Sequence, residues 1–124
     1  MSHILIVDDS PTETYVLKSI FEKQGYQVSE ACNGQEGIAV AEVQNPDLII
    51  MDLVMPGVNG FQATRELKNN NNTSHIPVII YSSKDQVTDR MWAMRQGAVA
   101  YMVKPIPKNQ LLSIIKKHLP TAVS

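Results

Sequence analysis

The sequence predicts an α/β fold, in which a doubly wound parallel sheet of five strands is flanked by five helices. The first observation is that five short apolar or β-branched runs alternate with five segments of helical periodicity along the 124 residues. Such alternation is typical of parallel strands joined by right-handed crossover helices. The second is that residues 4–7 and 48–51 are continuously apolar, as strands buried on both faces of a sheet are.

The first strand, residues 4–7, leads into a helix whose start is marked by three residues. Ser10 can cap the helix, Pro11 suits its first turn, and Glu13 can complete a capping box with Ser10. Gly25 marks the end of this helix. Its helical spacing is carried by Val16, Leu17, Ile20, Phe21 and Gln24.

The second strand is expected over residues 27–31. Asn33 and Glu36 repeat the capping pattern at the start of a second helix. This helix must end before Pro46, because the residue before a proline disfavours helical geometry.

The rest of the chain continues the alternation of strands and helices. Gly97 and Pro120 mark the ends of its last two helices. The expected elements are a strand at residues 48–52, a helix at 59–68, a strand at 78–81, a helix at 87–96, a strand at 100–103 and a helix at 108–118.

The fourth expected helix has two candidate core faces. Val87, Arg90 and Met94 share one face, while Val87, Met91 and Met94 share another. Periodicity does not decide which of them contacts the core. Trp92 fits either an interface anchor or a packed aromatic side chain.

Polar side chains stand where the expected strands end. Asp8 and Asp9 follow the first strand, Asp52 ends the third, Ser82 follows the fourth, and Lys104 follows the fifth. The carboxyl ends of parallel strands meet at one edge of the sheet, where open α/β proteins carry their sites. The sequence therefore predicts an acidic, cation-binding cleft at this edge.

These residues together resemble the receiver domain of two-component response regulators, most of all the stand-alone chemotaxis type. The resemblance implies one receiver domain over residues 1–124 with no output domain, and the flavodoxin-like strand order 2-1-3-4-5 of the chemotaxis receiver. Residues 84–98 are similar to regulators of pilus-based, twitching-type motility. The residues that carry the family resemblance are Asp8-Asp9, Asp52 with Met55-Pro56-Gly57 and Gly60, Ser82, and Lys104-Pro105.

The resemblance implies a magnesium site and a phosphoacceptor at the cleft. Asp52 is the implied phosphoacceptor. Mg²⁺ is implied to bind Asp9, Asp52 and the backbone carbonyl of Val54, with Asp8 acting through its charge and a metal-bound water. Mg²⁺ prefers oxygen ligands, and the lack of a His/Cys cluster argues against zinc.

The resemblance also implies how a phosphoryl group is held and sensed. Ser82 and Lys104 contact its oxygens, and the peptide bond before Pro105 is cis, which would aim Lys104 inward. Tyr101 is implied to be an aromatic side chain that changes rotamer as Ser82 moves. As an alternative, Tyr101 is an ordinary aromatic residue of an edge strand.

Two positions are implied to set the rate at which water removes the phosphoryl group. Val54 cannot orient a water molecule through a side-chain hydrogen bond, and Lys84 can only donate such bonds. Slow dephosphorylation is therefore expected. The chain is expected to be a signalling protein that catalyses only its own phosphorylation and slow dephosphorylation. Its expected partners are a histidine kinase and a target protein that binds the face of the fourth helix, fifth strand and fifth helix.

The composition argues against binding to nucleic acid or membranes and against an oxidising compartment. The net charge of −1 gives no general attraction to nucleic acid or anionic membranes, and no apolar stretch approaches the ~18 residues of a membrane span. Cys32 is the only cysteine, so an internal disulfide is excluded and the chain fits a reducing compartment and a cytoplasmic location. Free cysteines are usually buried, so Cys32 is expected to be a small buried hydrophobic residue. His3, His75 and His118 show no ligand spacing and are expected at the surface.

Three other classes of protein fit the residues less well. A metal-dependent aspartyl-phosphate phosphatase needs a second acid two positions after its nucleophile, where this chain has Val54. A phosphate-independent interaction module would lack an acid, the hydroxyl or the lysine, and none is missing. A flavodoxin-like electron carrier needs a Ser/Thr/Gly-rich phosphate loop, whereas residues 8–11 are acidic.

Overall fold

The computed structural model describes residues 1–120 of the chain. Within this range, five strands form one sheet in the order β2-β1-β3-β4-β5, and every neighbouring pair is parallel. This confirms the predicted doubly wound fold. The elements are β1 (His3–Val7), α1 (Pro11–Lys23), β2 (Gln27–Ala31), α2 (Gly34–Gln44), β3 (Leu48–Met51), α3 (Gly60–Asn69), β4 (Val78–Ser82), α4 (Val87–Arg95), β5 (Ala100–Val103) and α5 (Lys108–His118).

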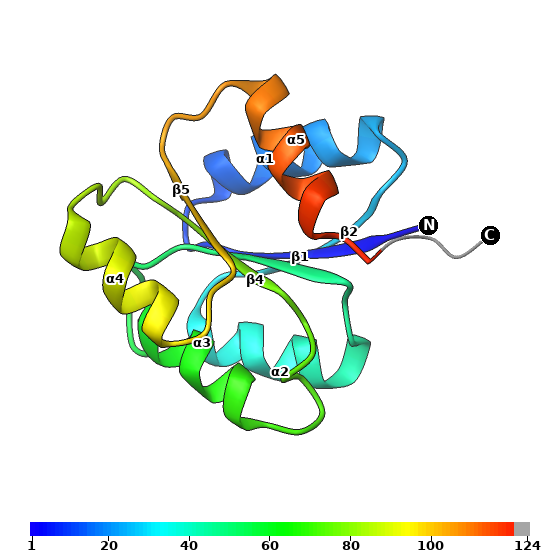
Figure 1. Ribbon diagram of the computed structural model, residues 1–124. Coiled ribbons are helices and arrows are strands. Elements are labelled where there is room, and N and C mark those ends of the chain that lie inside the picture. Colours follow the sequence, from blue (N-terminus) through cyan, green and yellow to red (C-terminus); the bar gives the residue numbers. More distant parts are fainter. Residues whose placement is uncertain (121–124) are drawn as a thin grey trace.

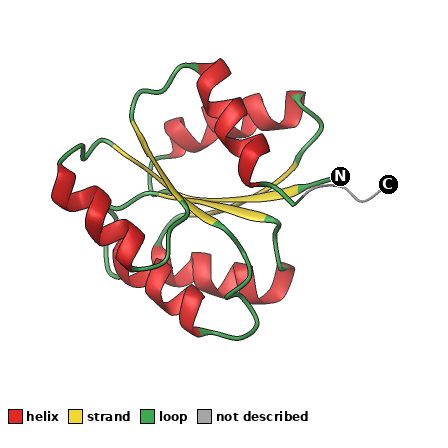
Figure 2. Cartoon of the chain, in the orientation of Figure 1, coloured by secondary structure: helices red, strands yellow, loops and turns green. Residues whose placement is uncertain are grey.

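The sheet lies between two layers of helices (Figures 1 and 2). α1 and α5 cover one face, and α2, α3 and α4 lie on the other. Successive residues of β1 enter the two cores in turn, because side chains alternate across a strand. Ile4 and Ile6 pack in the core that contains Phe21 of α1, whereas Leu5 and Val7 pack in the opposite core. β1 and β3 are therefore buried on both faces, as their continuous apolar character predicts.

The predicted helix caps of α1 and α2 are present. The Ser10 hydroxyl accepts a hydrogen bond from the Glu13 amide at 3.3 Å, and Asn33 accepts one from the Glu36 amide at 2.8 Å. The capping box proposed for Glu13 is wrong, however. The Ser10 amide donates instead to Asp8, and the Glu13 carboxylate turns to another partner, described below.

Neither candidate stripe of α4 contacts the core, so both sequence interpretations of this helix are wrong. Val87, Met91 and Met94 are about half or more exposed, and Trp92 is 53% exposed. Ala93 is the residue of α4 that is buried. The face that α4 turns toward the protein is therefore the one that carries Ala93, and its longer apolar residues are exposed.

Two further expectations about surface and core need correction. Val16 shares the helical spacing of Leu17 and Phe21, yet it is 51% exposed while the other two are buried. His75 is exposed as predicted, but His3 and His118 are half-buried. No helix among residues 1–120 combines the length and apolar character needed to cross a membrane.

Candidate functional site

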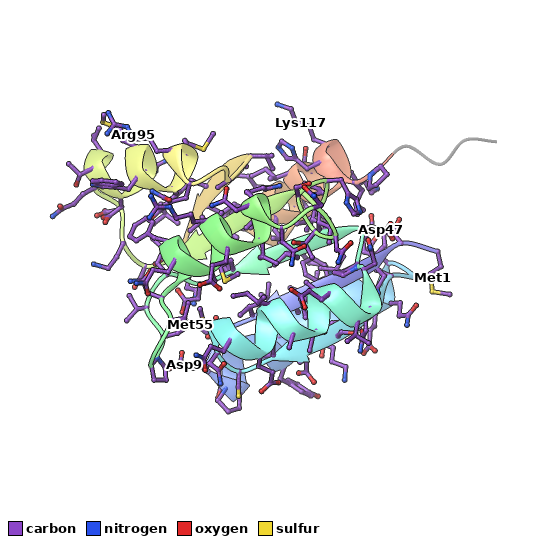
Figure 3. All side chains as sticks on the ribbon, turned by 90° about the horizontal axis from the view of Figure 1, so that it is seen from below. Met1, Asp9, Asp47, Met55, Arg95 and Lys117 are labelled. Carbon is purple, nitrogen blue, oxygen red and sulfur yellow. The ribbon has the colours of Figure 1, made fainter. Side chains whose placement is uncertain are left out.

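The carboxyl ends of the strands meet at one edge of the sheet, as the parallel topology requires. Asp9, which follows β1, lies at the same end of the molecule as Met55, which follows β3 (Figure 3). Met1 and Asp47, which precede these strands, lie at the opposite end. Residues that are far apart in the sequence therefore come together at the predicted edge.

Three carboxylates form the centre of the site. One oxygen from each of Asp8, Asp9 and Asp52 lies within 4.8 Å of the others. Asp8 and Asp52 are buried, whereas Asp9 is exposed. The Leu53 amide donates to Asp52 Oδ1 at 2.8 Å, so one oxygen of this carboxylate is fixed by backbone. The Ser10 amide fixes Asp8 Oδ1 in the same way, at 2.8 Å.

Lys104 brings a positive charge to these acids from the end of β5. Its Nζ lies 3.0 Å from Asp8 Oδ2 and 3.6 Å from Asp52 Oδ2. It also forms an ion pair with Glu13 of α1, a residue that sequence reasoning did not assign to the site. The lysine side chain is only 12% exposed. The Lys104–Pro105 peptide bond is cis, as the family resemblance implied.

The electrostatics of the site follow from burial and crowding. Burial raises the pKa of the Asp52 carboxyl above its ordinary value; Lys104 opposes this shift and Asp8 adds to it. Burial lowers the pKa of Lys104, but its hydrogen bonds to Glu13 and Asp8 and the charges of Asp52 and Asp8 together outweigh burial and raise that pKa above the ordinary lysine value. Lys104 therefore stays charged beside the acids.

The residues fit a hard divalent cation. A pocket of about 500 Å³ opens over the acids. The carboxylate oxygens that line it are ligands that Mg²⁺ prefers, and the pocket leaves room for the waters that the cation retains. The lining residues are Asp8, Asp9, Ser10, Glu13, Asp52, Ser83, Lys104 and Pro105. Val54 lies in the loop after Asp52 with its side chain 56% exposed.

Ser82 reaches this edge but does not line the pocket. It is fully buried, and its hydroxyl accepts a hydrogen bond from the Lys84 amide at 3.2 Å. Ser83 lines the pocket in its place. The Tyr101 hydroxyl donates to the Lys84 carbonyl at 2.7 Å, and the guanidinium carbon of Arg90 lies 5.3 Å from the centre of the Tyr101 ring. The loop that carries Ser82 is thus tied to β5 through Tyr101.

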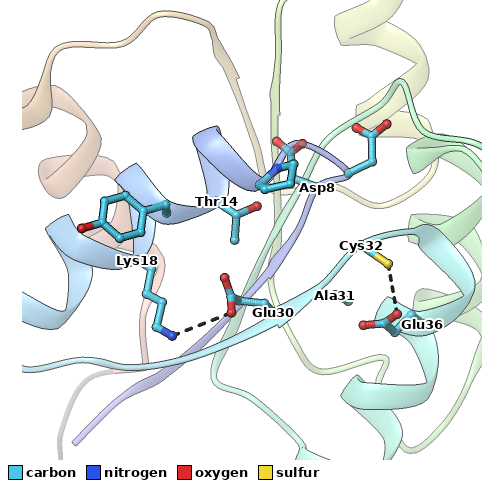
Figure 4. A pocket seen from close by; sticks show the side chains of 10 residues that line it. Asp8, Thr14, Lys18, Glu30, Ala31, Cys32 and Glu36 are labelled. Carbon is cyan, nitrogen blue, oxygen red and sulfur yellow. Dashed lines mark hydrogen bonds and ion pairs between the residues drawn. The ribbon is translucent and has the colours of Figure 1, made fainter.

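A second pocket of about 450 Å³ lies beside the first, between α1 and the loop after β2 (Figure 4). Cys32 lines it and is exposed, so the expectation of a buried cysteine is wrong. The Cys32 thiol donates to Glu36 Oε2 at 3.2 Å, which raises the pKa of the thiol. The position after β2 is a helix-entry loop, and this explains the exposure of the side chain.

Comparisons with known proteins agree with this geometry. The sequence pattern of the family described as "response regulator receiver domain" matches residues 4–116. The chain belongs to this family. PilH of Pseudomonas aeruginosa is 55% identical over 119 residues, which cover 96% of this chain and 98% of PilH.

Two solved structures show the same fold. The chemotaxis protein CheY4 of Vibrio cholerae superposes with a TM-score of 0.91 at 26% identity, covering 96% of this chain and 99% of that one. The receiver domain of the sensor histidine kinase PA1611 of Pseudomonas aeruginosa was solved with a magnesium ion in its active-site cleft. It superposes with a TM-score of 0.87 at 29% identity, covering 94% of this chain and 96% of that one.

This receiver domain is therefore a phosphorylation-dependent signalling module of the two-component type. Receiver domains bind Mg²⁺ in an acidic pocket, and Asp8, Asp9 and Asp52 form an acidic cluster at the corresponding edge of this sheet. They also interact with histidine kinases and downstream targets. The site thus has the chemical groups that the family's function requires.

Proposed function

We propose that Asp52 accepts a phosphoryl group from the phosphohistidine of a histidine kinase, and that the protein then changes the face it presents to a target. The observation that carries this proposal is the cluster of three carboxylates with Lys104 beside Asp52. Crowded acids favour a divalent cation, and a lysine is a suitable contact for a phosphoryl oxygen.

Mg²⁺ would be held by Asp9, Asp52 and the Val54 carbonyl, with Asp8 acting through its charge and a metal-bound water. When bound, the cation would neutralise part of the charge on the transferring phosphoryl group. The Leu53 amide holds Asp52 Oδ1, which leaves Oδ2 on the side of Lys104. An Asp52 oxygen forms the new bond to phosphorus as the imidazole nitrogen of the donor leaves.

The proposed switch consists of Ser82 and Tyr101. Lys104 and Ser82 would each bind a phosphoryl oxygen, as preorganised donors do at developing charge. Ser82 is buried and engaged by the Lys84 amide, so it must turn toward the pocket to act. Because Tyr101 is bonded to the same Lys84 residue, this movement would change the surface of α4, β5 and α5, where a target protein would bind.

Slow loss of the phosphoryl group is part of the proposal. Val54 and Lys84 stand at the positions that tune hydrolysis in the family. Neither side chain can accept a hydrogen bond from an attacking water. The protein would therefore catalyse only its own phosphorylation and a slow dephosphorylation.

The pathway is proposed from the relatives. Similarity to PilH and to the chemotaxis protein CheY4 supports a place in chemotaxis or pilus-type motility signalling. The exposed thiol of Cys32 fits a reducing compartment, so the proposed location is the cytoplasm. A phosphatase is disfavoured because Val54 occupies the position of the second acid that such enzymes need.

Amide chemical shifts of the protein with Mg²⁺ and phosphoramidate test this proposal. We expect changes that extend from Asp52 to Ser82, to α4 and to Tyr101, because phosphorylation shifts a two-state equilibrium of the whole face. The Ser82→Ala variant should take up the phosphoryl group but show smaller changes in α4. Changes confined to the residues around Asp52 in the wild-type protein would contradict the switch.

A further inference from the structure

Glu13 is a component of the site that the family resemblance does not account for. It lies in the first turn of α1 and lines the pocket together with Asp52 and Lys104. Its Oε2 accepts a hydrogen bond from Lys104 Nζ and forms an ion pair with it. The Glu13 carboxylate is thus bound to the ammonium group of Lys104, which in the proposed function binds a phosphoryl oxygen.

The contacts of Lys104 show which of its two hydrogen-bonded carboxylate partners, Asp8 or Glu13, can give way to a phosphoryl oxygen. Asp8 is buried, and its other oxygen is fixed by the Ser10 amide. Glu13 has a side chain that is 45% exposed, and its backbone amide already completes the Ser10 cap. The Glu13 side chain can therefore swing into water without breaking the helix start, whereas Asp8 cannot leave its place.

We propose that Glu13 is a positioning residue that holds Lys104 in the unphosphorylated protein and releases it when Asp52 carries a phosphoryl group. This inference rests on the proposed function, because it assigns Lys104 to the phosphoryl group. The Glu13 carboxylate competes with a phosphoryl oxygen for one ammonium group, and it therefore slows phosphoryl uptake. Partly exposed ion pairs are weak, so removing Glu13 should speed uptake by about two- to fivefold.

A second effect of Glu13 must be separated from this one. A carboxylate at the pocket also repels any anionic phosphodonor, whether or not it contacts Lys104. Repulsion persists when Lys104 is absent, but competition for its ammonium group does not. A double-mutant cycle between Glu13 and Lys104 distinguishes the two effects.

The kinetic test measures phosphoryl uptake from phosphoramidate with excess Mg²⁺, by intact mass, in four proteins and one control. These are the wild type, Glu13→Gln, Lys104→Met, the double variant, and Glu22→Gln, which changes an exposed residue of the same helix. We expect faster uptake in Glu13→Gln and unchanged uptake in Glu22→Gln. The acceleration by Glu13→Gln should be clearly smaller when Lys104 is replaced by Met, because only repulsion of the phosphodonor then remains. Equal rates in the wild type and Glu13→Gln would overturn the inference. Equal acceleration by Glu13→Gln with and without Lys104 would also overturn it.

A second measurement does not depend on the folding of the Lys104 variants. Zero-length carbodiimide coupling joins a carboxylate to an amine with which it is paired, and peptide mass mapping identifies the product. We expect a Glu13–Lys104 product in the free wild-type protein. Mg²⁺ with beryllium fluoride, which mimics a phosphoryl group on aspartate, should suppress it. The same addition should leave the product unchanged in Asp52→Ala.

The outcomes separate this inference from the proposed function. Absence of the Glu13–Lys104 product in the free protein overturns the inference, whatever the protein does with a phosphodonor. A product that persists in the wild type with beryllium fluoride, while phosphoramidate still phosphorylates the protein, also overturns the inference alone. A protein that forms the product but takes up no phosphoryl group overturns the proposed function and the inference with it.

Discussion

Replacing Asp9 with alanine is expected to weaken Mg²⁺ binding at least about tenfold and to slow phosphoryl uptake at least about a hundredfold. Asp9 is the exposed member of the acidic cluster, and its removal leaves two buried carboxylates to hold a cation that needs several oxygen ligands. The loss of metal removes the positive charge that the transferring phosphoryl group needs. Isothermal calorimetry with MgCl₂ measures the first effect, and intact mass with phosphoramidate measures the second.

The exposure of Asp9 makes this variant informative. The Asp9 side chain is exposed to solvent, so its replacement should not lower the midpoint of urea unfolding. Asp85→Ala, which removes another exposed acid, is the matched control and should leave Mg²⁺ affinity unchanged. Undiminished affinity in Asp9→Ala would show that the cation binds elsewhere.

Replacing Gly60 with alanine is expected to destabilise the protein by at least about 3 kcal/mol. Gly60 begins α3, and a Cβ atom placed on it would lie 2.1 Å from the Asp52 carbonyl oxygen and 2.8 Å from Leu53 Cα. Both are backbone atoms of the segment that carries Asp52, so no side chain can move aside to relieve the clash. The added methyl group must displace either α3 or the loop that positions Asp52.

Gly57→Ala is the matched control in the same loop. Gly57 has a φ of +75°, but a Cβ there would meet no heavy atom within 4 Å. Only backbone strain of about 1 to 2 kcal/mol is therefore expected. Urea unfolding of the two variants and the wild type measures both values. A Gly60→Ala variant no less stable than Gly57→Ala would mean that the loop and α3 separate easily.

The fold could be predicted from the sequence because its strands are so apolar. Residues 4–7 and 48–51 have no polar face, and only burial between two helix layers satisfies such a pattern. The acidic cleft followed from the same reasoning, since parallel topology brings Asp8, Asp52 and Lys104 to one edge of the sheet. Strand ends are thus the positions at which sequence reasoning about a site is strongest.

Side-chain partners and surface faces were harder to predict. Glu13 and Lys104 are far apart in the sequence, and a local capping rule gave the wrong partner for Glu13. The core face of α4 is set by one small residue, Ala93, whereas periodicity weighted the larger apolar side chains. Ser82 was placed at the correct edge, but its rotamer and its bond to the Lys84 amide depend on tertiary packing.

Intact mass of the wild-type and Asp52→Ala proteins, after incubation with Mg²⁺ and phosphoramidate, tests the central claim most directly. The wild-type protein should gain one phosphoryl group, and the gain should disappear when Mg²⁺ is removed with a chelator. Asp52→Ala should gain none, because no other carboxylate of the cluster both follows β3 and lies beside Lys104. A phosphoryl gain that persists in Asp52→Ala, or its absence from the wild type, would contradict the assignment of Asp52 as the phosphoacceptor.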